Sequence, residues 1–310
     1  MDRGAGVLPR PSLDALAAPV AASLPGAPAR RCWARLEPVK APLIALEEAT
    51  WTQVAGLDPT RTVVFLLSGP VEQHGPHLPL GSDLFQARLV MEAVVARVRE
   101  AGWTVLLAPT LPYTTAFLSR RFAGSVSIRK SNLVPFFRDL LCSFATNGLV
   151  NLVVVSQHLD PPHVLAWERA CREAAAEAGA RAIEGYERLL FDDLRSGALR
   201  ELLGEAVEGD SHAGLIETSI VLAARPELVA PAREGLEPVR LDFERDLRRA
   251  RDFRELGNGL GYTGDPAAGR AEIGERLVRR YAERFAAIVL DHLRGQEVWD
   301  RLSIRHLYPE

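Results

Sequence analysis

Short apolar segments alternate with longer amphipathic segments along most of this 310-residue chain. The apolar segments are rich in β-branched side chains, which is typical of buried strands. The predicted strands are 63–67, 105–108, 152–155 and 180–184, and the helices between them are 84–101, 132–147 and 163–178. Strands that alternate with helices pair in parallel, and the helices cover both faces of the sheet. The alternation therefore predicts a three-layer α/β/α fold with a mostly parallel central sheet.

The predicted domain has an irregular segment at each end. Residues 1–45 are rich in Ala, Pro and Arg without a sustained period, which is typical of an irregular N-terminal extension. Residues 46–295 form the domain itself, and residues 296–310 form a C-terminal tail. Further helices are expected at 46–57, at 188–207, at about 215–225 and at 270–293. The charged segment 243–253 is also expected to be a helix, exposed to solvent.

The composition is that of an ordinary globular protein. A net charge of −3 gives no reason to expect nucleic acid or an anionic membrane as a partner. Cys32, Cys142 and Cys171 are scattered without a Cys-x-x-Cys motif, as is typical of reduced thiols in the cytoplasm. No apolar run approaches the roughly 18 residues of a membrane helix, and the first residues lack the pattern of a secretory signal. We therefore expect a cytoplasmic protein.

The loop after the first of these strands is unusually rich in potential metal ligands. It runs from Ser68 to Asp83, and its three prolines and three glycines exclude regular structure. Within it lie Glu72, His74 and His77. Carboxylate oxygens together with imidazole nitrogens suit Zn²⁺ or Mn²⁺. For His77 we favour a structural role in which it bonds the loop or an acid near the site.

Two further clusters of histidine and acid are expected at the same edge of the sheet. His158 and Asp160 follow the strand 152–155, and the carboxyl ends of parallel strands are where α/β proteins bind ligands. Asp160 precedes two prolines, so it can equally be the N-cap of the next helix, whose His163 is then expected at the surface. The third cluster begins a predicted helix and consists of Asp210, His212 and Glu217.

Two of these segments resemble the signatures of the creatininase (creatinine amidohydrolase) family. The string Glu-Gln-His-Gly-Pro-His-Leu-Pro-Leu-Gly-Ser-Asp occupies 72–83, and Asp-Ser-His-Ala-Gly-Leu-Ile-Glu-Thr-Ser occupies 210–219. The segment Tyr-Thr-Gly-Asp-Pro at 262–266 also fits, and the resemblance extends over about 46–295. It implies an α/β fold, a site for two divalent metal ions and assembly into hexamers. The expected ions are Zn²⁺, Mn²⁺ or both, with Fe²⁺ as a further option.

The resemblance also implies a role for each candidate ligand. Glu72 and His158 are expected to hold one ion, His74 the other, and Asp83 to bridge the two. The last ligand is either Asp160, an acid two residues after His158, or Glu217, which we favour.

The implied reaction is hydrolysis of a C–N bond in an amide, cyclic amide or formamide of a small molecule or short peptide, by a water that the metal ions activate. His212 is the candidate proton shuttle, and Asp210 is expected to orient it or to contact substrate.

One departure from the family pattern concerns the substrate. Most members of the family carry Asn-Gly-His-Gly-Gly-Asn after the third strand, whereas this chain has Ser-Gln-His-Leu-Asp-Pro at 156–161. Proline fixes φ and removes a backbone donor, so the wall that faces the substrate differs from the usual one. Two alternatives follow: a metal-poor binding or assembly protein without hydrolase activity, and a metal enzyme that isomerises or opens a ring without net hydrolysis.

Overall fold

The structure is a computed structural model that describes residues 41–241 and 252–305. Its centre is a five-stranded sheet in the order β1-β3-β2-β4-β5, and every strand pair in it is parallel. The strands are β1 (Leu43–Ala45), β2 (Thr62–Leu67), β3 (Thr104–Leu107), β4 (Asn151–Val155) and β5 (Arg181–Ile183). The prediction of a parallel central sheet is therefore confirmed for the described residues.

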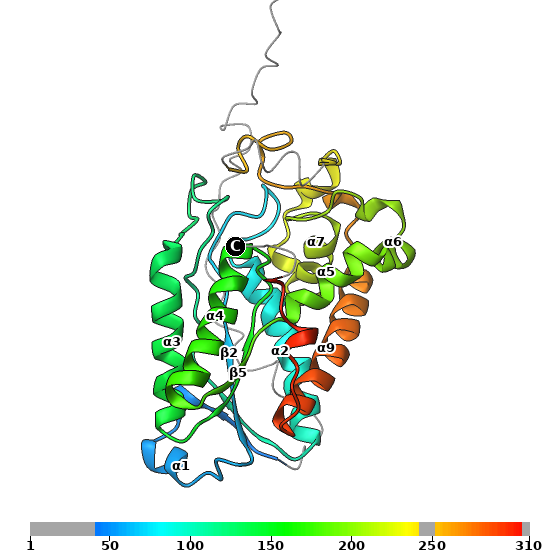
Figure 1. The fold of residues 1–310 in the computed structure, drawn as a ribbon. Coiled ribbons are helices and arrows are strands. Elements are labelled where there is room, and N and C mark those ends of the chain that lie inside the picture. The colour runs from blue at the N-terminus through cyan, green and yellow to red at the C-terminus, as the bar shows by residue number, and fades with distance from the viewer. Residues whose placement is uncertain (1–40, 242–251, 306–310) are drawn as a thin grey trace, which may run out of the picture. The chain divides into compact units, whose positions relative to one another are not determined.

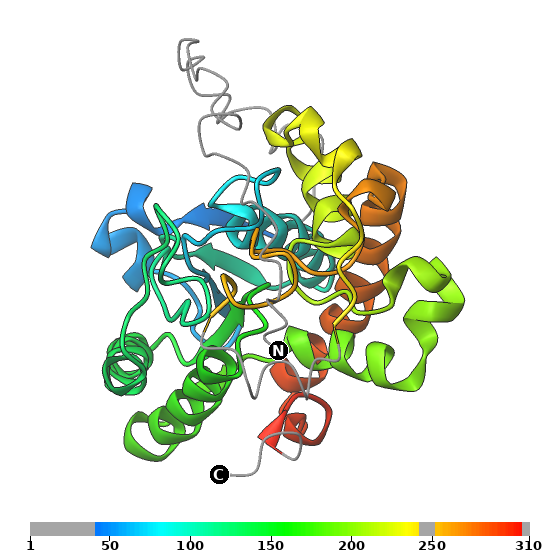
Figure 2. The same ribbon diagram turned by 90° about the horizontal axis from the view of Figure 1, so that it is seen from above.

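Helices cover both faces of this sheet, as Figures 1 and 2 show. They are α1 (Trp51–Ala55), α2 (Ser82–Glu100), α3 (Lys130–Thr146), α4 (Pro161–Ala178), α5 (Tyr186–Ser196), α6 (Ala198–Leu203), α7 (Leu215–Ala224) and α9 (Ala271–Leu293). Short 3-10 helices occupy 46–48, 205–207, 226–228, 231–235, 266–268 and 299–301. Helices α3 and α4 pack on one face, and α2, α5, α7 and α9 pack on the other. The three-layer α/β/α architecture is thus confirmed.

The central strand β2 shows why the sheet needs two helical layers. Val63, Phe65 and Leu67 belong to the hydrophobic core under α2 and α9, whereas Val64 and Leu66 belong to the core under α3 and α4. Successive side chains of a strand point to opposite faces, so a strand whose last five residues are all apolar must be covered on both sides. All six residues of β2 are buried.

The carboxyl ends of β2 and β4 are joined directly. The Ser68 amide donates to the carbonyl of Val155 at 3.0 Å, so the two loops that follow these strands start side by side. The loop after β2 then runs into α2, whose first turn contains Asp83. This connection brings the first two predicted ligand clusters to the same edge of the sheet.

Three details differ from the sequence-based predictions. Residues 43–45, predicted to be irregular, form the edge strand β1, which is too short for a periodic pattern to reveal. The predicted helix 46–57 is a 3-10 turn followed by the short α1. In the predicted tail, Val298, Leu302 and Ile304 are buried. Residues 1–40, nearly all of the predicted helix 243–253, and 306–310 lie outside the described residues. Within the described ranges no helix combines the length and apolarity needed to cross a bilayer.

Candidate metal centre

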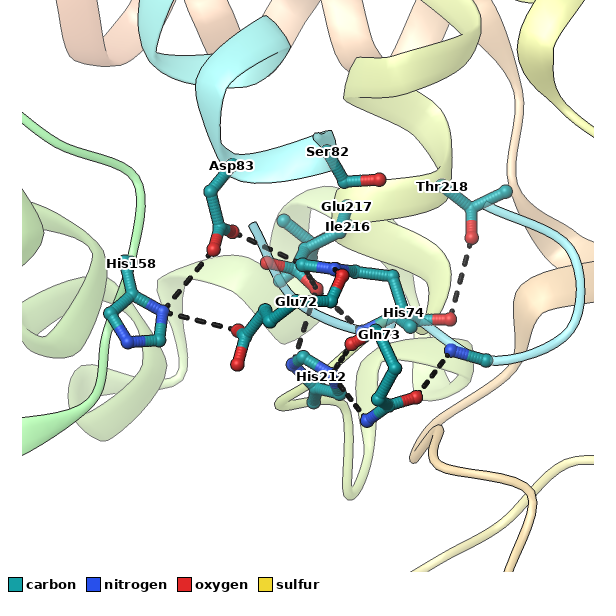
Figure 3. Close-up of polar contacts among 12 residues, drawn as sticks. Glu72, Gln73, His74, Ser82, Asp83, His158, His212, Ile216, Glu217 and Thr218 are labelled. Carbon is teal, nitrogen blue, oxygen red and sulfur yellow. Dashed lines mark hydrogen bonds and ion pairs between the residues drawn. The ribbon is translucent and has the colours of Figure 1, made fainter. Parts of the chain in front are cut away.

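Four separate segments contribute to one cluster of buried acids and imidazoles (Figure 3). The loop after β2 carries Glu72 and His74, and the first turn of α2 carries Asp83. The loop after β4 carries His158, and the first turn of α7 carries Glu217. Each of these five side chains is buried. The sheet edge therefore gathers the side chains that the sequence distributes over three distant motifs.

The first group of potential ligands consists of Glu72, Asp83 and His158. The Nδ1 atom of His158 lies 3.2 Å from Glu72 Oε1 and 3.2 Å from Asp83 Oδ2. The opposite nitrogen, Nε2, is 2.8 Å from the carbonyl of Thr115, which can only accept, so Nε2 carries a proton. Burial alone would lower the pKa of His158, but the two carboxylates raise it well above its ordinary value. A positive charge is therefore favoured at this position, and a metal ion bound to Nδ1 supplies one as well as a proton does.

The second group consists of His74, Asp83 and Glu217. The Nε2 atom of His74 lies 3.1 Å from Asp83 Oδ1 and 3.7 Å from Glu217 Oε2. Its Nδ1 atom donates to the Glu72 carbonyl at 3.1 Å, which directs Nε2 at the acids. Burial opposes charge on this ring, yet Asp83 and Glu217 raise the pKa of His74 to about 10. This group therefore has the same character as the first: an imidazole nitrogen faces two carboxylates.

Asp83 belongs to both groups and lies between them. Its Oδ1 faces His74 and its Oδ2 faces His158, and Figure 3 shows the two rings on either side of it. Burial would raise the pKa of Asp83, but the neighbouring His74 and His158 lower it far below its usual range. The carboxylate is therefore ionised and directed at two separate positions, as a bridging ligand is.

His212 closes the cluster on its other side. Its ring centroid is 4.5 Å from that of His74, and it stacks on Phe253 at 4.3 Å with 14° between the planes. Nε2 donates to the carbonyl of Gln73 at 2.8 Å, and Nδ1 lies 3.9 Å from Glu217 Oε2. Burial and the positive charge of His74 lower the pKa of His212. A neutral ring with its Nδ1 lone pair towards the acids follows, and a third group of potential ligands includes it with Glu72 and His74.

Asp210 and Asp160 lie outside all three groups of potential ligands among the described residues. Asp210 Oδ2 accepts from the backbone amide of Ile216 at 3.2 Å, in the first turn of α7, and burial raises the pKa of Asp210 to about 8. The described contacts do not join it to His212. Asp160 Oδ2 lies 3.8 Å from Nε2 of His158, on the ring edge away from Glu72 and Asp83. Of the two acids considered for the last ligand, Glu217 is the one that reaches the cluster.

The sequence-based interpretation of His163 was wrong, because the side chain is buried rather than exposed. Its Nδ1 is 2.6 Å from Thr114 Oγ1 and its Nε2 is 3.0 Å from Ser156 Oγ. The same Ser156 oxygen accepts from the His158 amide at 3.2 Å, so His163 supports the loop that carries a candidate ligand. His77 contacts Thr218 Oγ1 at 2.9 Å through Nε2, as suits the structural role predicted for it.

Gln73 and Thr115 were not among the predicted site residues, yet their backbone carbonyls orient the imidazoles of His212 and His158. A backbone carbonyl has no signature in the residue type, so no sequence signal was available for Thr115. For Gln73, the hint that the sequence offered was its position between Glu72 and His74.

Comparison with known proteins agrees with this architecture. The family model for creatininase, described as creatinine amidohydrolase, matches residues 47–289. The mycofactocin precursor peptide peptidase of Mycobacterium ulcerans (strain Agy99) is 31% identical over 220 residues, which are 67% of this chain and 77% of that protein. The creatinine amidohydrolase of Pseudomonas putida is 26% identical over 193 residues, which are 59% of this chain and 72% of that protein.

Solved structures show the same fold. A creatinine amidohydrolase (creatininase) superposes with a TM-score of 0.65 at 21% identity, and the match covers 82% of this chain and 98% of that one. A structure described as creatininase Mn superposes with a TM-score of 0.62 at 20% identity, and the match covers 87% of this chain and 100% of that one. Fold, site and relatives together define a hydrolase of carbon–nitrogen bonds. The chain belongs to the creatininase family, which confirms the resemblance noted in its motifs.

Proposed function

We propose that this chain is an amidohydrolase with two divalent metal ions per subunit that cleaves an amide, cyclic amide or formamide bond of a small molecule or short peptide. The observation that supports this most directly is the position of Asp83. Its two carboxylate oxygens face different imidazoles, at 3.1 Å and 3.2 Å, and each imidazole has a second carboxylate beside it. A single structural ion pair does not require this duplicated arrangement.

The donor set fits divalent metal ions. In the group of Glu72, Asp83 and His158, and in that of His74, Asp83 and Glu217, one imidazole nitrogen and two carboxylates converge, with ligand atoms within 4.8 Å of one another. Three electron-pair donors that face one another in a buried site repel unless a cation lies among them. Asp83 Oδ2 also has no hydrogen-bond donor among the described residues. Mixed nitrogen and oxygen ligands favour Zn²⁺ and Mn²⁺, with Fe²⁺ as the remaining option.

We assign Glu72, Asp83 and His158 to one ion, and His74, Asp83 and Glu217 to the other. Two ions in such a site lower the pKa of a water and polarise the carbonyl that it attacks. The protein holds the ligands in place through backbone carbonyls, those of Thr115 for His158 and Glu72 for His74. These contacts fix the tautomer and orientation of each ring before any ion binds.

His212 is the proposed proton shuttle. The Gln73 carbonyl fixes the proton on Nε2 and leaves the Nδ1 lone pair 3.9 Å from Glu217 Oε2, within the cluster. Stacking on Phe253 holds the ring in that orientation. Nδ1 is the atom that accepts a proton from the attacking water and returns it to the leaving nitrogen. Asp210 supports this arrangement indirectly, because its carboxylate accepts from the first turn of the helix that carries Glu217.

The choice of substrate depends on the altered loop after β4. Where the pattern of most family members has two glycines and an asparagine, this chain has Leu159, Asp160 and Pro161. Two relatives are named for different substrates, a precursor peptide and creatinine. We infer that the loop selects a substrate of its own among small amides and short peptides. We also propose that the subunits assemble into a homo-oligomer in the cytoplasm, which size-exclusion chromatography with light scattering and cell fractionation can test.

The experiment is metal analysis combined with a substrate screen. The purified protein is dialysed against metal-free buffer and its zinc, manganese and iron are quantified by mass spectrometry. It is then assayed with lactams, formamides and short peptides, before and after chelation and metal return. About two equivalents of metal per chain and a metal-dependent hydrolysis of at least one class are expected. Less than one equivalent, with turnover that chelation does not affect, would contradict the proposal.

A further inference from the structure

Asp160 occupies the N-cap position of α4 but cannot cap this helix with its side chain. The next two residues, Pro161 and Pro162, have no N–H to offer. The following two amides, of His163 and Val164, donate to the carbonyl of Asp160, at 2.8 Å and 3.2 Å. An N-cap carboxylate normally accepts from these first amides. The carboxylate of Asp160 therefore lacks its usual donors, because two of these positions are prolines and the next two amides already donate to the backbone carbonyl.

The carboxylate lies beside the metal centre without belonging to it. Its Oδ2 is 3.8 Å from Nε2 of His158, and that nitrogen already donates to the Thr115 carbonyl at 2.8 Å. Oδ2 has no hydrogen-bond partner in the described part of the chain, while the backbone amide of Phe117 contacts the carboxylate group. The side chain is 13% exposed, so a small part of it remains accessible beside His158.

Apart from His158, the described residues include no ion-pair partner for Asp160. Among the described residues no ion pair joins Asp160 to a lysine or arginine, and Lys130 acts on it only at longer range. A buried carboxylate with an unused oxygen is costly unless a donor reaches it. The Phe117 side chain, about half exposed at 51%, lies on the loop that carries the amide contact. One oxygen of the carboxylate is thus left without a hydrogen-bond donor among the described residues, next to a candidate metal ligand.

We propose that Asp160 binds a protonated primary amine of the substrate, located within about one residue of the scissile bond. This inference rests on the proposed function, because it takes the metal centre as the place of reaction. It makes Asp160 a specificity-determining residue rather than a metal ligand. The substrate class is then an amide or short peptide with a free amino group, as opposed to one whose nitrogen is acylated.

The test measures binding with matched probes. Alaninamide and leucinamide, and the N-acetylated form of each, are titrated into the metal-loaded protein and followed by NMR. The wild type is expected to bind each free amine about tenfold or more tightly than its acetylated partner, since a charge-assisted hydrogen bond is lost on acetylation. The Asp160→Asn variant should reduce this ratio to within about twofold. Asp139→Asn, at a side chain that is 69% exposed on α3, is the matched control and should keep the ratio.

Measurements of metal content and folding distinguish an amine-binding role of Asp160 from a role as a metal ligand. Asp160→Asn should retain the wild-type metal content; loss of metal would make Asp160 a ligand and overturn the inference. Equal binding of both probes by the wild type, or equal weakening of both in the variant, would also overturn it. Asp160→Ser, which also removes the charge but has a smaller side chain, repeats the measurement if the asparagine variant folds poorly. If the wild type hydrolyses nothing but still shows the amine preference, the proposed hydrolase fails while this inference stands.

Discussion

Asp83 Oδ2 lies 3.2 Å from Nδ1 of His158, a contact that joins the first turn of α2 to the loop after β4. The other oxygen of the same carboxylate lies 3.1 Å from His74. One acid therefore connects the two halves of the cluster.

Substitution of Glu217 should remove one of two metal ions. Glu217→Gln keeps the side-chain volume but removes the charge that faces His74, so the ion in the group of His74, Asp83 and Glu217 should be lost first. Activity should fall by at least about a hundredfold, since weaker changes around metal sites already cost 10–100-fold. Mass spectrometry of the dialysed variant should find about half of the wild-type metal. Unchanged metal content would rule Glu217 out as a ligand.

His212 should matter for turnover more than for metal binding. His212→Asn removes Nδ1 as a proton acceptor, and general acid–base groups typically contribute about 10²–10⁴-fold to a rate. We expect kcat to fall within that range while both metal ions remain and KM changes little. Phe253→Leu, which removes only the ring stacked on His212, is the milder companion variant. Loss of metal from His212→Asn would instead make it a ligand, as its grouping with Glu72 and His74 permits.

A pair of buried acids next to β5 should make stability depend on pH. Burial raises the pKa of Glu187 to about 7 and, together with Glu187, raises the pKa of Glu184 well above its usual value. An acid with a raised folded-state pKa stabilises the fold fully below its unfolded pKa, and this contribution is lost as the pH rises towards the folded value. For Glu187 the window runs from its ordinary value of 4.5 to about 7.

Urea unfolding at pH 5 and pH 8 tests this dependence. Glu187→Gln has no carboxyl to ionise, so at pH 8 it should be more stable than the wild type by roughly 1–3 kcal/mol. At pH 5 the difference should shrink or reverse. Glu177→Gln, at a side chain that is 61% exposed, serves as the control and should change neither value. A wild type that gains stability relative to Glu187→Gln between pH 5 and pH 8 would contradict the prediction.

His163 should stabilise the fold and the candidate centre together. His163→Ala leaves the hydroxyls of Thr114 and Ser156 without their ring partner and opens a cavity, which should cost about 2–4 kcal/mol of unfolding free energy. Because Ser156 also holds the His158 amide, metal affinity should weaken as well. Thermal unfolding with and without added Zn²⁺ measures both effects. A variant with wild-type stability and metal affinity would show that this hydrogen-bonded chain is dispensable.

The layers and the sheet were predictable because strand and helix periods differ and are sustained in this chain. Strand β1 could not be predicted, because three residues are too few to show a periodic pattern. The ligand segments were predictable because strand ends of a parallel sheet meet at one edge. Glu217 was favoured over Asp160 from the family resemblance, and it lies in the cluster, whereas the position of Asp160 beside the other nitrogen of His158 depends on the contact of that ring with the Thr115 carbonyl, which no residue pattern reveals. The burial of His163 likewise depends on tertiary packing against Thr114 and Ser156.

The central claim is that Asp83 bridges two metal ions, and anomalous X-ray diffraction from crystals of the metal-loaded protein tests it most directly. Data collected at the zinc and manganese edges should show two peaks, one beside each carboxylate oxygen of Asp83. One peak should also touch His158 and the other His74. A single peak, or peaks that do not contact Asp83, would contradict the account.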